Sequence, residues 1–249
     1  MNRLRKLWAV PDIHGRSDLL LKALDKIEEE GYDDNLDGVV FLGDMIDRGP
    51  DSKGVLDIII RFQKDHKNVV VLRGNHEDFA VDYYVKHLAH SRDAWYMNGG
   101  RQTEWSYPDV RMTEEHIRFL ASLPYHYQED GFHFSHAPVP REKHRQGKID
   151  GVREYSVGEL TWTYMGPECD KTGALFDQHE GPRSDNGTGD KHLIGVCGHI
   201  HRGRNVTKVR QFPKYRMLDV GCGCWDEAPL AIHECHSGQT FYITGEYNP

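Results

Sequence analysis

Residues 38–49 read GVVFLGDMIDRG, an apolar run that ends at a glycine and passes directly into charged side chains. A nearly all-apolar run of this length is typical of a strand buried on both faces, as in a parallel sheet. The same arrangement occurs twice more: LWAV at 7–10 precedes PDIHG, and NVVVL at 68–72 precedes RGNHE. The three runs predict three parallel strands with polar residues at their carboxyl ends.

Two amphipathic segments connect these strands. The first follows Ser17, a candidate N-cap, and Gly31 is placed to end it; the second covers residues 51–65. Apolar side chains recur at helical spacing in both, at Leu20, Ala23, Leu24 and Ile27 and then at Val55, Leu56, Ile59 and Phe62. Because strands alternating with helices build parallel sheets, residues 7–72 predict a βαβαβ unit and an α/β fold.

The remainder of the chain adds further elements at lower regularity. We expect helices over 77–89 and 113–123, a hairpin turning at Asp130-Gly131, and strands over 193–197, 216–220, 230–235 and 240–243. Two stretches break the rhythm, the aromatic-rich residues 91–111 and the polar residues 138–192. We interpret both as insertions, the first on the surface and the second along the substrate wall, within one domain spanning 1–249.

Composition excludes several classes of protein. The 249 residues are 38% hydrophobic and 28% charged, which is ordinary for a globular chain. The formal net charge of −8 argues against general binding to nucleic acid or to an anionic membrane. No run approaches the roughly 20 apolar residues of a membrane span, and the five cysteines lack CxxC spacing. We therefore expect a cytoplasmic protein with free thiols.

Metal-ligating side chains collect just after the apolar runs. Asp12 and His14 are two residues apart, as are His199 and His201, so each pair can point to the same side of an extended backbone. Seven candidates share this context: Asp12, His14, Asp44, Asn75, His136, His199 and His201. Imidazole mixed with oxygen donors suits manganese, iron or zinc better than calcium. Seven ligands are too many for one tetrahedral ion and fit two ions that share a carboxylate.

Each of these residues alone has a simpler interpretation. Asp12 or Asp44 could cap a helix or turn, Asp47 and Arg48 could form a surface ion pair, and a single histidine could be structural. Their joint occurrence argues against this, because capping does not require several histidines and an asparagine at successive strand ends.

The ordered segments DIHG, GDMIDRG, GNHE, SHAP and GHIH resemble those of the calcineurin-like metallophosphoesterases. GDMIDRG together with RGNHE resembles the PPP-type serine/threonine phosphatases, including the short bacterial and phage enzymes. The resemblance covers positions 6–245. It implies a β-sandwich of two mixed sheets flanked by helices, and a pair of divalent metal ions, manganese foremost, with iron, zinc or nickel as alternatives.

The resemblance also implies a role for each matching residue. Asp12, His14 and His201 would hold the first metal, Asp44 would bridge, and Asn75, His136 and His199 would hold the second. His76 would be the general acid, oriented by Asp47. Arg48 would bind the phosphoryl oxygens, and Arg73 would add positive charge to the substrate site.

Physical chemistry supports a phosphomonoesterase reaction with these parts. Hydroxide that bridges two metal ions is a nucleophile near neutral pH, and the ions clamp the phosphoryl oxygens during in-line attack. A protonated His76 can supply the proton that the leaving alkoxide needs, and the planar fork of Arg48 matches two phosphate oxygens. We expect a phosphorylated substrate, either a phosphoprotein or a nucleotide, and no membrane partner.

Two departures from the family pattern keep alternatives open. Tyr164 stands where the protein phosphatases have a second phosphate-binding arginine, and Arg153, Arg202 or Arg204 could replace it. GHIH leans toward the phosphodiesterases, so the alternative substrate is a nucleotide or polynucleotide end, such as diadenosine tetraphosphate, a 3′-phosphate or a 2′,3′-cyclic phosphate. The Asp47-Arg48 pair favours the phosphatase, since similar diadenosine tetraphosphate hydrolases commonly have Ala-Arg there.

A rival from another class is a metal-binding protein that keeps the fold without catalysis. Such proteins usually lose a ligand or the acid histidine. This chain retains all seven candidate ligands and His76, which favours an enzyme.

Overall fold

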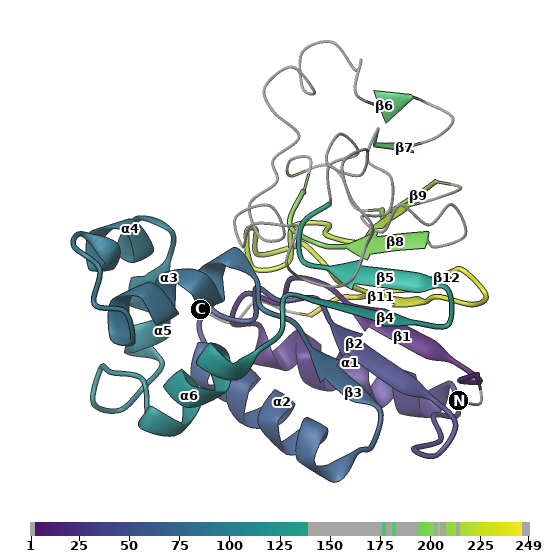
Figure 1. The fold of residues 1–249 in the computed structure, drawn as a ribbon, viewed down its shortest axis with the longest axis horizontal. Coiled ribbons are helices and arrows are strands. Elements are labelled where there is room, and N and C mark those ends of the chain that lie inside the picture. The colour runs from purple at the N-terminus through teal and green to yellow at the C-terminus, as the bar shows by residue number, and fades with distance from the viewer. Residues whose placement is uncertain are drawn as a thin grey trace, which may run out of the picture.

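A computed structural model describes residues 3–138, 176–177, 181–182, 194–201, 204, 208–212 and 215–245. Two five-stranded sheets lie face to face, and helices cover the outer face of the first sheet (Figure 1). The first sheet has the order β12 (Gln239–Ile243), β11 (Leu230–Glu234), β1 (Leu7–Val10), β2 (Gly38–Phe41) and β3 (Val69–Val71). The second has the order β4 (His126–Glu129), β5 (Phe132–Ser135), β8 (Ile194–Cys197), β10 (Tyr215–Met217) and β9 (Arg210–Phe212).

Both sheets mix parallel and antiparallel pairs. In the first sheet β1, β2 and β3 are parallel, whereas β11 runs antiparallel to β1 and to β12. In the second sheet β8 is parallel to β5 and β10, and the edge strands β4 and β9 are antiparallel to their neighbours. The expected α/β fold of two mixed sheets flanked by helices is thus confirmed.

The βαβαβ unit forms as the sequence predicts. α1 (Ser17–Glu29) connects β1 to β2, and α2 (Ser52–Asp65) connects β2 to β3. Every residue of β1 and β2 is buried, because α1 and α2 pack on one face of the sheet and the second sheet packs on the other. Burial on both faces explains why these strands are continuously apolar rather than alternating.

One helix start differs from the expectation. Ser17 is the first residue of α1 rather than its cap, and its hydroxyl donates to Asp51 Oδ2 at 2.6 Å. Asp51 itself caps α2 by accepting from the backbone N–H of Gly54 at 2.8 Å. The prediction of a Ser17 cap was wrong: Ser17 lies inside the helix, and its hydroxyl donates to Asp51 instead of accepting from a backbone N–H of the first turn.

Four helices follow β3. They are α3 (Asn75–Tyr84), α4 (Ser91–Met97), α5 (Gly100–Trp105) and α6 (Glu114–Ser122). α3 begins two residues earlier than predicted and so includes Asn75 and His76. Residues 91–111 contain α4 and α5, which pack against α3 and α2 and bury Trp95 completely, so this stretch is not simply a surface insertion. Among the described residues, no helix is both long and apolar enough to cross a membrane.

The second sheet confirms the hairpin and corrects two strands. β4 and β5 turn at Asp130 and Gly131, whose φ angles are both positive, as a tight hairpin of this sequence requires. The strand expected over 216–220 ends at Met217, and Asp219 begins a turn by accepting from the backbone N–H of Gly221. β9 was not predicted, because its short polar sequence shows no apolar pattern. Most of the expected insertion at 138–192 lies outside the described residues, apart from a pair of two-residue strands, β6 (Phe176–Asp177) and β7 (Gly181–Pro182).

Candidate metal centre

The candidate residues follow the carboxyl ends of five strands, β1, β2, β3, β5 and β8; most lie in loops, and Asn75 and His76 begin α3. Five of them have left-handed backbones, with φ between 46° and 73°: His14, Asp44, Asp47, Arg48 and His199. Non-glycine residues adopt this conformation at a cost, and such residues concentrate at functional sites. The loops are held in shape by their packing against one another, and their backbones turn the side chains inward.

Asp44 is the common member of two groups of donor atoms. The first group contains His14, Asp44 and His76, and the second contains Asp44, His136 and His199; within each group the donor atoms lie within 4.8 Å of one another. All five residues are at least nine-tenths buried. The carboxylate therefore stands where one residue can contact two positions for positive charge.

Asn75 completes the second group. Its Oδ1 lies 2.9 Å from His136 Nε2, which is also 3.1 Å from His199 Nδ1 and 3.4 Å from Asp44 Oδ1. Oxygen and nitrogen atoms from four different strand ends converge on this point. The donor set is the one expected for a transition-metal ion rather than for calcium.

Backbone hydrogen bonds set the ring orientation of two histidines. His14 Nδ1 lies 2.9 Å from Ile46 O, and His136 Nδ1 lies 3.0 Å from Leu42 O. Because a carbonyl only accepts, each Nδ1 donates its proton to that carbonyl, and each Nε2 faces the cluster. Metal-ligating histidines usually donate their other ring N–H in this way, so these two residues fit a divalent ion.

The charge distribution also fits a cation. Burial lowers the pKa of His14 well below its ordinary value and lowers that of His199 to about 3, so both rings are neutral and able to coordinate. Burial also acts to lower the pKa of His136, but the charge of Asp44 outweighs it and raises the pKa to about 10. The pocket therefore attracts positive charge.

Asp12 lies beside this cluster and fixes the β8 loop. Its Oδ1 accepts from the backbone N–H of His199 at 2.9 Å, and its Oδ2 is 4.0 Å from His14 Nε2. A Cβ on Gly198 would fall 2.1 Å from Asp12 Oδ1, so only glycine allows the two loops to approach. Burial and the charge of Asp219 raise the pKa of Asp12 well above its ordinary value, which a neighbouring cation would oppose.

Two candidate residues are directed elsewhere. The half-buried ring of His201 packs edge-on against Trp225, with 4.7 Å between centroids, and belongs to neither donor group. Arg73 donates to Tyr125 Oη at 2.8 Å and to the backbone oxygen of Ala121, and it pairs with Asp78 at 3.4 Å. The structure therefore does not bring the Arg73 guanidinium into the cluster.

The candidates for a second phosphate-binding arginine lie outside the cluster or outside the described residues. Arg204 is exposed and pairs with Glu227 at 3.3 Å on the surface. Arg153, Tyr164 and Arg202 lie outside the described residues.

A second set of polar residues adjoins the first donor group. His76 Nδ1 lies 2.7 Å from Asp47 Oδ2. Arg48 donates through Nη2 to His76 Nε2 at 3.0 Å and through Nη1 to His14 Nε2 at 2.7 Å. A carboxylate, an imidazole and a guanidinium thus lie side by side at the edge of the cluster. The guanidinium can bind an oxyanion, and the imidazole with its carboxylate can transfer a proton.

Several residues of this centre had no role in the sequence analysis. Glu77 is fully buried, and its carboxylate accepts from the backbone N–H groups of Asp44, Met45 and Gly74 at 2.8 Å each. It joins the loops after β2 and β3, and its place at the third residue of α3 was the available signal. Cys224 Sγ accepts from Arg48 Nη1 at 2.7 Å, a contact that no local sequence pattern indicates.

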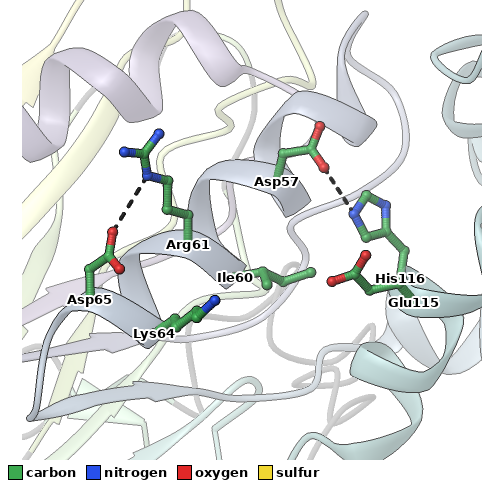
Figure 2. Close-up of a pocket in the computed structure, with 7 residues that line it drawn as sticks. All are labelled: Asp57, Ile60, Arg61, Lys64, Asp65, Glu115 and His116. Carbon is green, nitrogen blue, oxygen red and sulfur yellow. Dashed lines mark hydrogen bonds and ion pairs between the residues drawn. The ribbon is translucent and has the colours of Figure 1, made fainter.

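A separate groove of about 410 Å³ lies between α2 and α6 (Figure 2). Two pairs of its polar side chains interact: Asp57 Oδ1 is 3.1 Å from His116 Nε2, and Arg61 Nε is 3.4 Å from Asp65 Oδ2. The groove runs along the middle and C-terminal turns of α2. It contains none of the residues of the metal centre.

Comparisons with known proteins agree with this arrangement. Serine/threonine-protein phosphatase 1 of Salmonella typhimurium is 37% identical over 119 residues, which cover 48% of this chain and 47% of that protein. Serine/threonine-protein phosphatase 2 of Escherichia coli is 26% identical over 167 residues, covering 64% and 67%. The match thus spans about half the length of the first relative.

A solved structure and a family model complete the comparison. The crystal structure of a protein assigned as a diadenosine tetraphosphatase superposes with a TM-score of 0.61 over 98% of this chain and 95% of that one; at 18% identity it shows the fold alone. The model of the calcineurin-like phosphoesterases matches residues 5–203, well over half of the sequence. The chain therefore belongs to the calcineurin-like phosphoesterase family.

Proposed function

We propose that this protein is a two-metal phosphomonoesterase of the serine/threonine protein phosphatase type. The observation that carries the proposal is the position of Asp44, which belongs to both donor groups and has His76 and Arg48 beside it. A shared carboxylate between two groups of nitrogen and oxygen donors is the arrangement for two divalent ions. The similarity to two bacterial serine/threonine phosphatases supports the substrate class.

In this proposal His14 and Asp12 would hold the first ion, and Asn75, His136 and His199 the second, with Asp44 available to both. His76, the third member of the first donor group, would be kept for proton transfer. His201 remains a proposed ligand of the first ion that the geometry does not favour. Such ions supply a water that is nucleophilic near neutral pH and neutralise the phosphoryl oxygens. Manganese is our first choice, and the donor set accepts iron, zinc or nickel as well.

The chain's own residues bind the substrate and deliver a proton. Arg48 offers two N–H donors directed toward the cluster, and a phosphoryl group bound there would replace the imidazole nitrogens as their acceptor. His76 Nε2 lies 3.0 Å from the same guanidinium, so the leaving oxygen of that phosphoryl group would be within its reach. Asp47 holds the opposite nitrogen of His76, leaving Nε2 as the atom that donates the proton.

The test is hydrolysis of p-nitrophenyl phosphate and of a phosphoserine peptide by manganese-loaded protein. We expect Asp44→Asn to lower kcat on both substrates, and His76→Asn to lower kcat on the phosphoserine peptide, by about 10²-fold or more, the usual loss when an essential charge or a general acid is removed. His66→Asn is the matched control, since His66 is a histidine paired with Asp34 at the end of α2, outside the centre. Wild-type turnover by both site variants would contradict the assignment.

A substrate panel distinguishes the phosphatase from its alternative. Diadenosine tetraphosphate, a nucleoside 3′-phosphate and a 2′,3′-cyclic phosphate are assayed beside the phosphopeptide at one enzyme concentration. The proposal expects the highest kcat/KM on the phosphopeptide. A higher value on any of the nucleotides would replace it with the nucleotide or polynucleotide-end hydrolase.

A further inference from the structure

Asp47 is held by two helices that contribute none of the candidate residues. Its carboxylate is completely buried, and Oδ2 contacts His76 Nδ1 at 2.7 Å. The indole N–H of Trp95, in α4, donates to both carboxylate oxygens at 2.9 and 3.0 Å. The hydroxyl of Thr103, in α5, donates to Oδ1 at 2.6 Å. Three donors from three helices therefore fix one carboxylate.

The backbone of Asp47 is fixed by the same neighbours. Its N–H lies 2.9 Å from Thr103 Oγ1 and 3.0 Å from Ser52 Oγ, and the two hydroxyls are 2.9 Å apart. Thr103 and Ser52 have no exposed surface. The left-handed backbone of Asp47 (φ 73°) thus has partners on both its carboxylate and its amide, which offset the cost of that conformation.

Trp95 is itself held in one orientation. The ring is fully buried, lies 5.6 Å from the ring of Tyr84, and faces Gly100 so closely that a Cβ there would fall 2.4 Å from it. The preceding residue, Gly99, accepts from the backbone N–H of Arg48 at 3.4 Å. The α4–α5 segment, residues 91–105, therefore contacts both Asp47 and Arg48 with a rigid surface.

A buried carboxylate with a single partner would be free to rotate or to take up a proton. Burial raises the pKa of Asp47, and the hydrogen bonds from His76, Thr103 and Trp95 oppose that rise. Removing one neutral donor takes one hydrogen bond from the buried carboxylate and leaves it freer to shift against His76. The effect on catalysis would pass through the orientation of His76, since neither Trp95 nor Thr103 contacts the metal centre.

We propose that Trp95 and Thr103 are positioning residues, which hold the Asp47 carboxylate so that His76 is aligned to protonate the leaving oxygen. This inference rests on the proposed function and adds to it a role for the α4–α5 segment. The α4–α5 segment then supports the general acid His76 through Asp47, and we call this support the brace; its two contacts are the indole N–H and the threonine hydroxyl.

The test uses the dependence of rate on the leaving group. Trp95→Phe retains a buried ring without the N–H, and Thr103→Val retains the shape of threonine without the hydroxyl. Phosphoserine and phenyl phosphate need a proton on the departing oxygen, whereas p-nitrophenolate leaves with little help. We expect each variant to lose about tenfold or more in kcat on the first two substrates and no more than about threefold on the third, with KM little changed.

Trp105→Phe is the matched control, because Trp105 belongs to the same segment and is 64% exposed. It should retain wild-type rates on all three substrates. An equal loss on every substrate in Trp95→Phe and Thr103→Val, or no loss at all, would overturn the positioning role. If one variant fails to fold, the other still decides.

A second measurement is independent of activity. In the metal-free protein, the proton shared by His76 Nδ1 and Asp47 is followed by nitrogen-edited NMR. We expect its resonance to move upfield and its exchange with water to accelerate in Trp95→Phe, but not in Trp105→Phe; an unchanged signal would overturn the inference. A wild-type protein that hydrolyses none of the substrates would instead refute the proposed function, and the NMR comparison would still decide whether the brace exists.

Discussion

Adding a single methyl group at Gly74 should disrupt the metal centre while leaving the protein folded. Gly74 precedes α3 with φ −95°, a conformation open to any residue, so its backbone does not require glycine. A Cβ at this position, however, would lie 2.1 Å from Asp44 Oδ1 and 2.6 Å from Asp44 N. Glycine is required here because the loops after β2 and β3 approach each other too closely for a side chain.

The size of the effect follows from these distances. Ordinary contact begins near 3.4 Å, so in Gly74→Ala the carboxylate oxygen must retreat by more than ~1 Å. Overpacking of this kind costs about 2 kcal/mol, which lowers Tm by roughly 4–8 °C for a chain of this size. A displacement of ~1 Å in a catalytic group costs about 10²-fold in rate. We therefore expect a folded variant with about one hundredth of the wild-type kcat.

The assay combines thermal unfolding with manganese-dependent hydrolysis of p-nitrophenyl phosphate. Gly31→Ala is the control: Gly31 has φ 80° at the end of α1 and open space around it, so alanine there costs ~1–2 kcal/mol in backbone strain and leaves kcat unchanged. Comparable losses of Tm with very different losses of kcat would support the reasoning. A folded Gly74→Ala protein with wild-type kcat would refute it.

Three further predictions concern stability. Chelation of the metal should lower Tm and manganese should restore it, because manganese at a hundredfold excess over Kd adds about 2.7 kcal/mol per site to the free energy of unfolding. Scanning fluorimetry measures the shift, and a similar shift in Asp44→Asn would argue against the site. Burial lowers the pKa of His233 to about 4, so below a pH of about 6.5 the unfolded chain binds a proton that the folded chain does not. Between about pH 7 and 5, urea unfolding should therefore show the free energy of unfolding of the wild type falling by about 2 kcal/mol more than that of His233→Gln. Equal decreases in the two proteins would contradict this prediction. Asp37 is completely buried and accepts from the backbone N–H groups of Lys6 at 3.0 Å and Asp33 at 2.9 Å. Asp37→Ala should therefore lower the free energy of unfolding by about 3 kcal/mol without changing kcat. A loss below about 1 kcal/mol would show that water replaces the carboxylate.

The first sheet and its helices could be predicted because their signals are local. The apolar runs at 7–10 and 38–42 and the helical spacing of Leu20, Ala23, Leu24 and Ile27 each report burial on their own element. The failures arise where a distant contact decides or where the local pattern is weak. Ser17 looked like a cap but bonds to Asp51, a residue 34 positions away, and α4 and α5 were hidden in a polar, aromatic sequence with weak periodicity.

The candidate ligands could be named from the sequence, whereas their partners could not. Asp12, His14, Asp44 and Asn75 stand directly after apolar runs, and parallel strands deliver such residues to one edge of a sheet. Their spacing does not say which side chain turns inward. Arg73, next to Gly74-Asn75, bonds to Tyr125 and Asp78 instead, and the ring of His201 packs on Trp225.

Sequence alone determined the chemistry available to this protein, because side chains able to hold a metal or transfer a proton follow five of the strands. Only the tertiary structure decided that Asp44 stands between two groups of imidazoles and that Glu77 joins the loops after β2 and β3. The tertiary structure also decided that Trp95 and Thr103 donate hydrogen bonds to Asp47. Apart from the bond between Glu77 and nearby Gly74, these contacts join residues 30 to 155 positions apart, and several depend on left-handed backbone at single residues. Neither distance in space nor the sign of φ is written in the local pattern of apolar and polar residues, since both arise only when the sheets pack.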